Sequence, residues 1–205
     1  MQQDRSTYQA SARGEQDYHE FAVKLVEHYA LGLQDRQVEQ IQSLSPAFLD
    51  RALQNQVAGY TIHGFARVLV EMLNPIATTI AISGSPLESL SALVSYLGFQ
   101  EHNSTLIKVD DGRYTGHVDR NLAISESKRQ LVGTYLIEGV NLEASFAFGD
   151  SVQDVPVLET VGNPFVLGSN LELQSIGRRR GWSVVSAQDD IVGIVKSRIT
   201  SLFGR

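Results

Sequence analysis

Two aspartates four residues apart, Asp150 and Asp154, follow a short apolar run in the stretch FAFGDSVQDVPVLETVGNP (146–164). An apolar strand that ends in a carboxylate and turns at once into a helix is typical of a ligand site, because ligands of open parallel sheets bind beyond the carboxyl ends of the strands. A carboxylate pair at this spacing can place one oxygen on a hard cation and use the second to orient it. Taken alone, Asp150 would more simply cap the following helix.

A second polar strand end is Ser83-Gly84-Ser85-Pro86, which follows the β-branched run ATTIAIS. A hydroxyl, a glycine turn and a helix start together offer hydrogen-bond donors to an anion. Lys128 stands near another predicted helix start, from which it could reach back to neutralise a phosphate. Each feature has a simpler reading, as a common turn or a solvated lysine. Their order along one fold favours a shared site.

The segments that must position these residues alternate between strands and helices from residue 77 onward. Strand patterns at 77–83, 144–149, 164–168 and 182–185 are separated by helical patterns at 87–97, 126–138, 154–161, 170–180 and 191–203, and a hairpin is predicted at 104–118. Such alternation predicts an α/β fold with a parallel sheet flanked by helices.

The first 75 residues contain helical patterns and no strand pattern. We expect residues 1–14 to be disordered and residues 1–75 to form a helical region beside an α/β core at 76–205. The four expected helices start near Tyr18, near Asp35, at Ser45-Pro46 and after Gly59, and Asn74-Pro75 ends the last.

Composition narrows the class of protein. The chain has 205 residues, 42% of them hydrophobic, which is enough for one sizeable core. A net charge of −6 and the lack of a basic tract argue against a nucleic-acid partner. The absence of cysteine excludes disulfides and thiolate metal sites. The polar N-terminus and the lack of a membrane-length apolar run predict a soluble, cytoplasmic protein.

Taken together, these motifs resemble the haloacid dehalogenase (HAD) superfamily, in its phosphoserine-phosphatase-like branch with a helical cap. IAISGSP is similar to the second motif of that family, so the resemblance implies that Ser83 and Gly84 bind phosphate. Lys128 matches the lysine of the third motif. FGDSVQDVPVL matches the fourth, which makes Asp150 the implied Mg²⁺ ligand, with Asp154 supporting it. The implied HAD-like core is Rossmannoid, with residues 1–75 as its cap and a small phosphorylated metabolite as its ligand.

The resemblance fails at one motif. Family members begin with an apolar strand that ends in Asp-x-Asp-x-Thr, which supplies the nucleophile, the acid–base group and metal ligands. This sequence has no such stretch, and Asp4-Arg5-Ser6-Thr7 lacks both the apolar strand and the second carboxylate. We therefore expect no catalytic residue, weak or absent Mg²⁺ binding, and no turnover by this chain alone.

Two hypotheses follow from this departure. The chain is a phosphomonoesterase whose first strand is lost by truncation, a late start codon or a split gene, or it is a pseudophosphatase that binds a phosphorylated ligand or a protein partner. Without that strand, the strands at 78–83 and 145–149 lack a shared neighbour. They could pair directly, accept residues 1–14, or accept a strand from another chain. Of these we favour direct pairing or donation, with self-association as a consequence.

Substrate identity is not encoded in a recognisable motif. The helical region offers possible contacts to a substrate carboxylate or hydroxyl, and none is selected because exposed arginines are usually solvated. These residues are Arg36, Arg51, His63 and Arg67.

Overall fold

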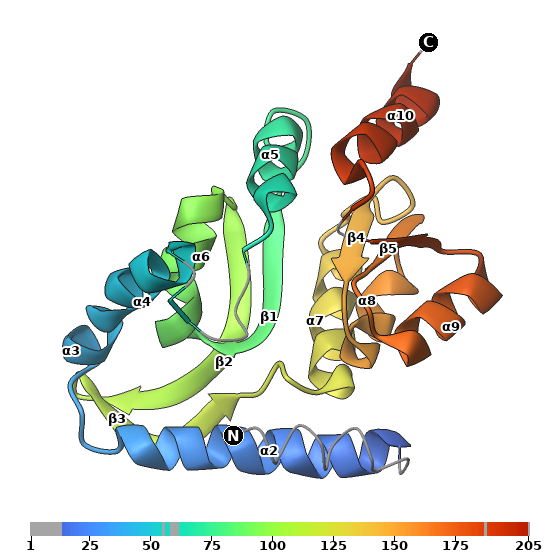
Figure 1. The fold of residues 1–205 in the computed structure, drawn as a ribbon. Helices are drawn as coiled ribbons and strands as arrows, with labels where there is room; N and C mark the ends of the chain where they lie inside the picture. Colours follow the sequence, from blue (N-terminus) through green and yellow to red (C-terminus); the bar gives the residue numbers. More distant parts are fainter. Residues whose placement is uncertain (1–13, 55, 58–61, 187, 205) are drawn as a thin grey trace.

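The computed structural model describes residues 14–54, 56–57, 62–186 and 188–204, with side chains described from residue 19 onward. Helices flank two three-stranded sheets, ordered β1-β2-β3 and β4-β5-β6 (Figure 1). The strands are β1 (Ile80–Pro86), β2 (Glu101–Asp110), β3 (Arg113–Arg120), β4 (Phe146–Gly149), β5 (Asn163–Leu167) and β6 (Ser183–Val185).

The helices divide between an N-terminal run and the crossovers that join the strands. The N-terminal run consists of α2 (Gly14–Leu33), α3 (Val38–Gln42), α4 (Leu44–Leu53) and α5 (Gly64–Leu73). The crossovers and the last helix are α6 (Leu87–Leu97), α7 (Ser125–Ile137), the 3₁₀ turn η1 (Val152–Asp154), α8 (Val155–Leu158), α9 (Leu171–Arg180) and α10 (Ile191–Phe203).

Strand directions follow the alternation in the sequence. β1 is parallel to β2, and β4, β5 and β6 are parallel to one another. β2 and β3 form the antiparallel hairpin predicted around Asp110-Asp111-Gly112. Asp111 (φ 45°) and Gly112 (φ 70°) both adopt the left-handed conformation that a two-residue turn of this hand requires.

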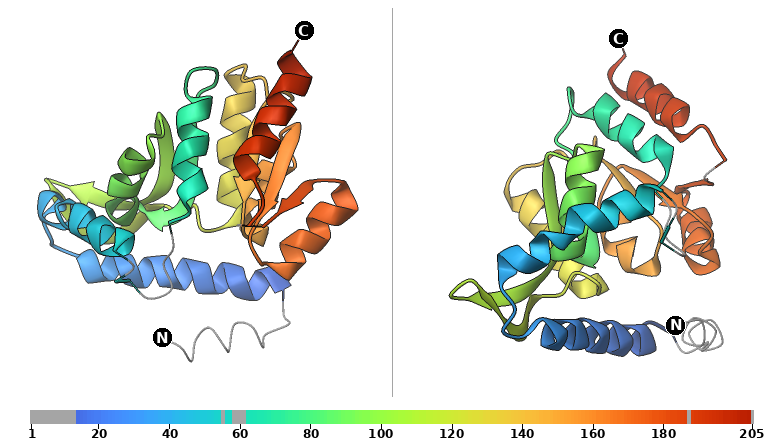
Figure 2. Two further views of the ribbon diagram at one scale, coloured as in Figure 1. Left: turned by 45° about the horizontal axis from the view of Figure 1, so that its top comes forward. Right: turned by 60° about the vertical axis from the view of Figure 1, so that its left-hand side comes forward.

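Two helices of the N-terminal run join the two sheets. α5 packs on the β4–β6 sheet, where its Leu69 shares a buried cluster with Phe165 and Val195. Figure 2 shows α5 and α10 side by side on that face. α2 lies along the opposite end of both sheets (Figure 1), where Val26 packs with Ile107 and shields the hairpin. The sheets are therefore held together by helices rather than by strand pairing.

The predicted α/β class with helix-flanked parallel strands is confirmed, but the strands do not form one sheet. β1 and β4 belong to different sheets, so their direct pairing, one of the three alternatives from the sequence, is wrong for the described part of the chain. The alternative that residues 1–14 fill the space concerns residues outside the described ranges, apart from Gly14, where α2 begins.

Several element boundaries differ from the sequence prediction. α4 begins at Leu44 and not after Ser45, because the Ser45 hydroxyl is buried and accepts a hydrogen bond from the Ala92 backbone N–H (3.3 Å). β1 continues through the predicted turn to Pro86, which suits an edge strand because proline has no N–H to donate. The helix predicted at 154–161 is divided into η1 and the short α8. The predicted break at Gly59 lies outside the described residues.

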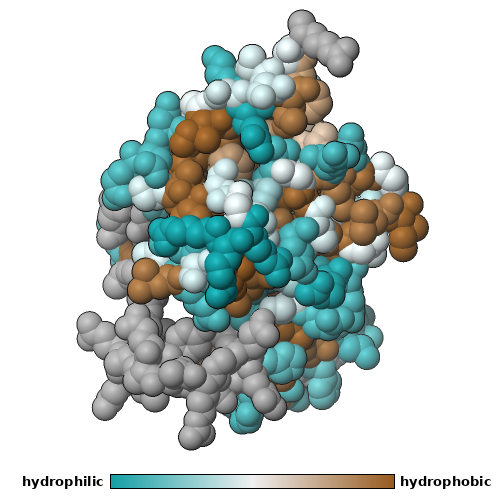
Figure 3. Space-filling view, turned by 90° about the vertical axis from the view of Figure 1, so that its right-hand side faces the viewer, coloured by the Kyte–Doolittle hydropathy of each residue, from teal (hydrophilic) through white to brown (hydrophobic). Residues whose placement is uncertain are grey.

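The molecular surface that includes α9 and α10 mixes hydrophilic and hydrophobic side chains (Figure 3). Leu171 and Phe203 are the large apolar residues of these helices with the greatest exposure, at 79% and 62%. In the described ranges, no helix combines the length and the apolar character needed to cross a membrane.

Candidate functional site

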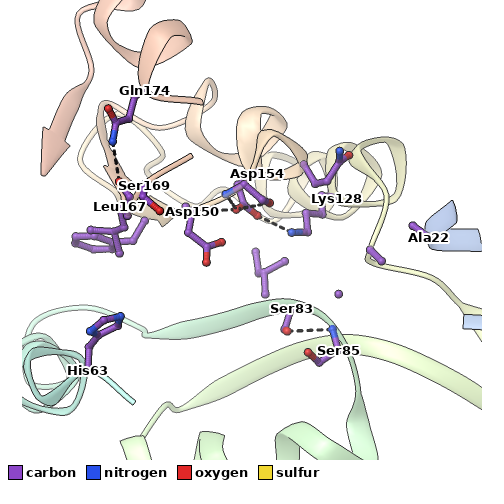
Figure 4. A pocket seen from close by; sticks show the side chains of 18 of the residues that line it. Ala22, His63, Ser83, Ser85, Lys128, Asp150, Asp154, Leu167, Ser169 and Gln174 are labelled. Carbon is purple, nitrogen blue, oxygen red and sulfur yellow. Dashed lines mark hydrogen bonds and ion pairs between the residues drawn. The ribbon is translucent and has the colours of Figure 1, made fainter. Parts of the chain in front are cut away.

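A cavity of about 1040 Å³ opens where the carboxyl ends of the parallel strands approach α2. β1 supplies one wall with Ile82 to Pro86, and β4 with the loop after it supplies the facing wall with Phe148 to Ser151. Figure 4 shows Ser83 and Ser85 on one side of this space and Asp150, Asp154 and Lys128 on the other. The topology thus brings both polar strand ends of the sequence to one site.

The β4 wall is organised around the Asp154 carboxylate. Its Oδ2 accepts hydrogen bonds from the backbone N–H of Asp150 (3.1 Å), and from the backbone N–H and the hydroxyl of Ser151 (both 3.0 Å). Its Oδ1 accepts from Nζ of Lys128 at 2.5 Å. Ser151 and Asp154 form a reciprocal capping box at the start of η1. The carboxylate therefore holds the loop and orients Lys128.

Lys128 is almost completely buried, with a side-chain exposure of 6%. It lies one turn into α7, whose first residue Ser125 donates a hydrogen bond from its hydroxyl to Oε1 of the buried Gln153 (2.6 Å). α7 and the loop after β4 are thus bound to each other at two points. The ammonium of Lys128 is held at the edge of the cavity, where it can also meet an anionic ligand.

Asp150 presents its carboxylate to the cavity (Figure 4). The protein walls that surround it raise its pKa above the ordinary 3.8, and the negative charge of Asp154 acts in the same direction. Lys128 partly opposes both effects because its positive charge favours the ionised form. Within the described residues, Asp150 forms no ion pair with a cation, because Nζ of Lys128 pairs with Asp154.

The β1 wall is held from behind. Ser83 Oγ accepts a hydrogen bond from the backbone N–H of Ser85 (3.1 Å), so the hydroxyl lies over its own turn. The buried Thr105 hydroxyl donates to the Gly84 carbonyl (2.8 Å) and accepts from the Leu122 backbone N–H (3.0 Å). Gly84 also needs its lack of a side chain, because a Cβ there would lie 2.7 Å from Cα of Ala123.

The carboxylates that line the cavity in the described part of the chain are Asp150 and Asp154. Both oxygens of Asp154 are already engaged, which leaves Asp150 to bind a cation. Among the described residues, no three His, Asp or Glu side chains are grouped as a metal would require. Mg²⁺ demands near-octahedral oxygen ligation, so these residues do not fit a Mg²⁺ ion by themselves.

All five site residues predicted from the sequence line this cavity: Ser83, Gly84, Lys128, Asp150 and Asp154. Their roles toward phosphate and metal stay predictions. Of the four possible substrate contacts in the helical region, His63 lines the cavity, whereas Arg36, Arg51 and Arg67 do not.

Sequence reasoning missed the residues that support the site. Thr105, Ser125 and Gln153 all act through contacts between distant parts of the chain. A local signal did exist for the Asp154 network, because the spacing Ser151-x-x-Asp154 is that of a capping box.

Comparison with known proteins places this geometry in a family. The family profile described as haloacid dehalogenase-like hydrolase matches residues 4–159. A Mycobacterium leprae (strain TN) protein named as a hydrolase is 28% identical over 154 residues, which cover 74% of this chain and 50% of that protein. A protein of Mycobacterium tuberculosis named phosphoserine phosphatase is 31% identical over 104 residues, which cover 50% of this chain and 34% of that protein. The chain spans about half the length of the curated relatives that it matches over the longest stretches.

Solved structures agree on the fold. A phosphoserine phosphatase in its apo form superposes with a TM-score of 0.58 at 19% identity, over 88% of this chain and 82% of that chain. A Bordetella pertussis Tohama I protein superposes with a TM-score of 0.57 at 22% identity, over 86% and 85%. With a family profile that matches most of its length and a fold shared with phosphoserine phosphatases, the chain belongs to the haloacid dehalogenase-like hydrolase family.

Proposed function

We propose that residues 1–205 form the phosphate-binding part of a phosphomonoesterase of the phosphoserine-phosphatase type, and that this chain alone binds a small phosphorylated metabolite without hydrolysing it. The observation that supports this proposal is that Ser83, Lys128 and Asp150 line one cavity at the carboxyl ends of the strands. The Ser83 hydroxyl and the Lys128 ammonium suit the oxygens of a phosphate group. Relatives named as phosphatases support the same class of ligand.

The lack of turnover is inferred from the groups that face the ligand. Covalent phosphoryl transfer needs a free nucleophile and a separate acid–base group, which contributes about 10²- to 10⁴-fold. In the described ranges the cavity offers Asp150 alone as an unengaged carboxylate. The remaining groups can bind and position a phosphate, but they cannot complete its hydrolysis.

The described residues offer no complete Mg²⁺ site for the proposed phosphatase. Asp150 by itself is a weak site for Mg²⁺, because this ion gives up its bound water molecules reluctantly. We expect that millimolar Mg²⁺ leaves the melting temperature of the free protein unchanged. A clear rise that disappears in Asp150→Asn would show that further groups complete a metal site.

We also propose the division into a helical cap at 1–75 and a core at 76–205, and a cytoplasmic location. α2 supports a cap role because Ala22, Leu25 and Val26 line the cavity opposite the strand ends. α5 makes the boundary less simple, since it packs into the β4–β6 half through Leu69.

A second candidate is a pseudophosphatase that uses the same cavity for binding only. It is favoured by the engagement of Asp154 inside the protein, which leaves one free carboxylate. The two candidates differ in whether hydrolysis appears when an extended apolar segment ending in Asp-x-Asp is supplied. Turnover of p-nitrophenyl phosphate under that condition supports the phosphatase, and its absence supports the binding scaffold.

The binding proposal is tested by calorimetric titration of the protein with phosphoserine and with inorganic phosphate. We expect binding that weakens at least about tenfold in Ser83→Ala and in Lys128→Met, since each removes a donor to a charged group. Lys24→Met is the matched control, because Lys24 pairs with Glu20 on the exposed face of α2. Equal binding by all four proteins, or hydrolysis of phosphoserine by the unmodified chain, would contradict the proposal.

A further inference from the structure

A second, smaller cavity lies at the amino ends of β5 and β6, at the end of that sheet that points away from α2 (Figure 1). Its volume is about 220 Å³. The first residues of both strands and the turn between α9 and β6 line it, together with Arg180 at the end of α9 and Arg198 of α10. Among the described residues that line this cavity, none is acidic. The cavity therefore has two cationic side chains and no counter-charge in its own lining.

Arg198 is oriented by a buried amide. Asn163, at 3% exposure, donates from its side-chain nitrogen to the backbone carbonyls of Ser145 (3.2 Å) and Glu143 (3.4 Å). These bonds fix the amide, whose Oδ1 accepts a hydrogen bond from Nε of Arg198 (2.9 Å). Within the described part of the chain, Arg198 forms no ion pair. Its guanidinium is thus positioned by the protein while its charge is not neutralised.

Arg180 is positioned by two contacts. One of its terminal nitrogens donates to Oε2 of Glu159 (2.7 Å), and its guanidinium lies 5.2 Å from the centre of the Trp182 ring. Glu159 is shared, because its other oxygen accepts a hydrogen bond from Arg129 (2.8 Å). A guanidinium carries five N–H donors. Arg180 therefore keeps donors and part of its charge for a ligand of the cavity.

Two oriented guanidinium groups on one small cavity are suited to an anion. Their planar forks match the oxygens of a carboxylate or a phosphate, with which they form paired, charge-assisted hydrogen bonds. Ser183, the first residue of β6, adds a hydroxyl to the lining. The volume lies below the roughly 300–1,000 Å³ of sites for drug-sized ligands, which favours a small molecule over a nucleotide or a peptide.

We infer that the cavity between Arg180 and Arg198 is a binding site for a small anionic metabolite that carries carboxylate or phosphate groups. This site is separate from the cavity at the strand ends, because no described residue lines both. β5 connects the two, with Asn163 in one lining and Leu167 in the other. The inference does not depend on the proposed phosphate binding at the strand ends.

Trp182 makes the site observable. It is the only tryptophan of the chain, it lines the cavity, and its ring lies beside Arg180. Its emission is followed during titration with citrate and with inorganic phosphate, at an ionic strength held constant with NaCl. We expect a saturable change with citrate and a weaker one with phosphate, because citrate can engage both guanidinium groups at once. Saturation by either anion supports the inference, whereas unchanged emission with both, or an equal change with NaCl alone, overturns it.

Substitution of the two arginines tests the site directly. Arg198→Gln and Arg180→Met should each raise the half-saturating citrate concentration at least about tenfold, since each removes charge-assisted donors. Arg67→Met is the matched control, because Arg67 also lies over a ring, that of Tyr96 at 5.3 Å, and pairs with Glu71, but does so outside the cavity. Equal citrate affinity in all three variants would overturn the inference.

Two further measurements keep the test decisive. Calorimetric titration gives the citrate affinity of Arg180→Met independently, because this variant also changes the surroundings of Trp182. If Arg198→Gln does not fold, Arg180→Met decides the question. Ser83→Ala, which should weaken phosphate binding at the strand ends, should keep the response of Trp182 to citrate. Loss of that response in Ser83→Ala would assign the anion to the strand-end cavity and overturn the inference.

Discussion

The two walls of the cavity hold their polar groups in different ways. The β4 wall is charged and mostly local, since one carboxylate, Asp154, accepts four hydrogen bonds, three of them from its own loop and one from Lys128. The β1 wall is neutral, and it is held by a neighbouring strand through the Thr105 hydroxyl and by close contact with Ala123.

This difference determines where each wall is vulnerable. In the β4 wall, several interactions share one side chain, so a single substitution removes them together and leaves Lys128 buried without its counter-ion. In the β1 wall, the interactions are separate and neutral, so each substitution should have a smaller effect. The comparison can therefore be tested by substitutions of graded severity.

Asp154→Ala should produce the largest loss of stability. Removing one partner of a buried ion pair leaves the other charge buried and unpaired, which typically lowers the free energy of unfolding by about 3–5 kcal/mol. Lys128 and Asp154 have side-chain exposures of 6% and 14%, so the pair is of this kind. Urea denaturation would measure the change in the free energy of unfolding.

The control for this substitution is Glu71→Ala, which breaks the exposed pair of Glu71 with Arg67 on α5. Exposed pairs contribute little because water screens them, so this variant should unfold close to the parent. The double variant Lys128→Met/Asp154→Asn should recover part of the loss, since no buried charge is left unpaired. A loss in Asp154→Ala no larger than that in Glu71→Ala would contradict the contrast between the walls.

Alanine in place of Gly84 or Gly149 should lower the free energy of unfolding by less than Asp154→Ala does, by about 1–3 kcal/mol each, because an added methyl must displace packed atoms. A Cβ at Gly149 would lie 2.6 Å from Cβ of Asp154, and one at Gly84 would lie 2.7 Å from Cα of Ala123. Gly133→Ala in α7 is the control, since nothing lies within 4 Å of its Cβ, and it should stabilise by about 0.5–1 kcal/mol. Thermal unfolding of the three variants tests this order of stability. Melting temperatures of Gly84→Ala and Gly149→Ala equal to that of Gly133→Ala would contradict it.

Thr105→Val should weaken the β1 wall without changing its shape. It leaves the Leu122 N–H without its acceptor and the Gly84 carbonyl without its donor, at a cost of about 1–3 kcal/mol. Thr134→Val is the matched control, because the Thr134 hydroxyl bonds to Leu131 on an exposed helix surface. Phosphate affinity should fall in Thr105→Val alone, and equal affinity in both variants would show that the β1 wall does not need this bond.

The convergence of Ser83, Lys128 and Asp150 could be predicted because strand ends of a parallel sheet meet at one edge. Each of these residues was identified by its place at the end of a strand or the start of a helix. The boundaries of α6 and α10 could also be predicted, because amphipathic periodicity and the flanking turn residues agree there.

The division into two sheets and the support of the site could not be predicted as securely. Local pattern does not state which strands become neighbours, so direct pairing of β1 and β4 remained an open alternative. Thr105 looks like any β-branched strand residue in the sequence, and its role depends on the approach of Gly84 and Leu122. Ser45 resembled a helix cap, but packing against α6 buried its hydroxyl and moved the start of α4.

The smallest effect is expected for Asp150→Asn, and it has a defined dependence on pH. The folded protein raises the pKa of Asp150 above its ordinary 3.8, chiefly by burial, so the ionised form is less favourable in the folded state than in the unfolded state. Between the unfolded and folded pKa values the folded state binds more protons, and stability from this group falls as the pH rises through that window.

The Asp150→Asn variant removes this unfavourable ionisation. It should therefore be at least as stable as the parent at pH 7, and its advantage should shrink as the pH approaches 4. Melting temperatures of both proteins from pH 4 to 8 measure this difference. A variant that is less stable at pH 7, with a gap that widens toward neutral pH, would show that the Asp150 carboxylate stabilises the β4 wall as Asp154 does.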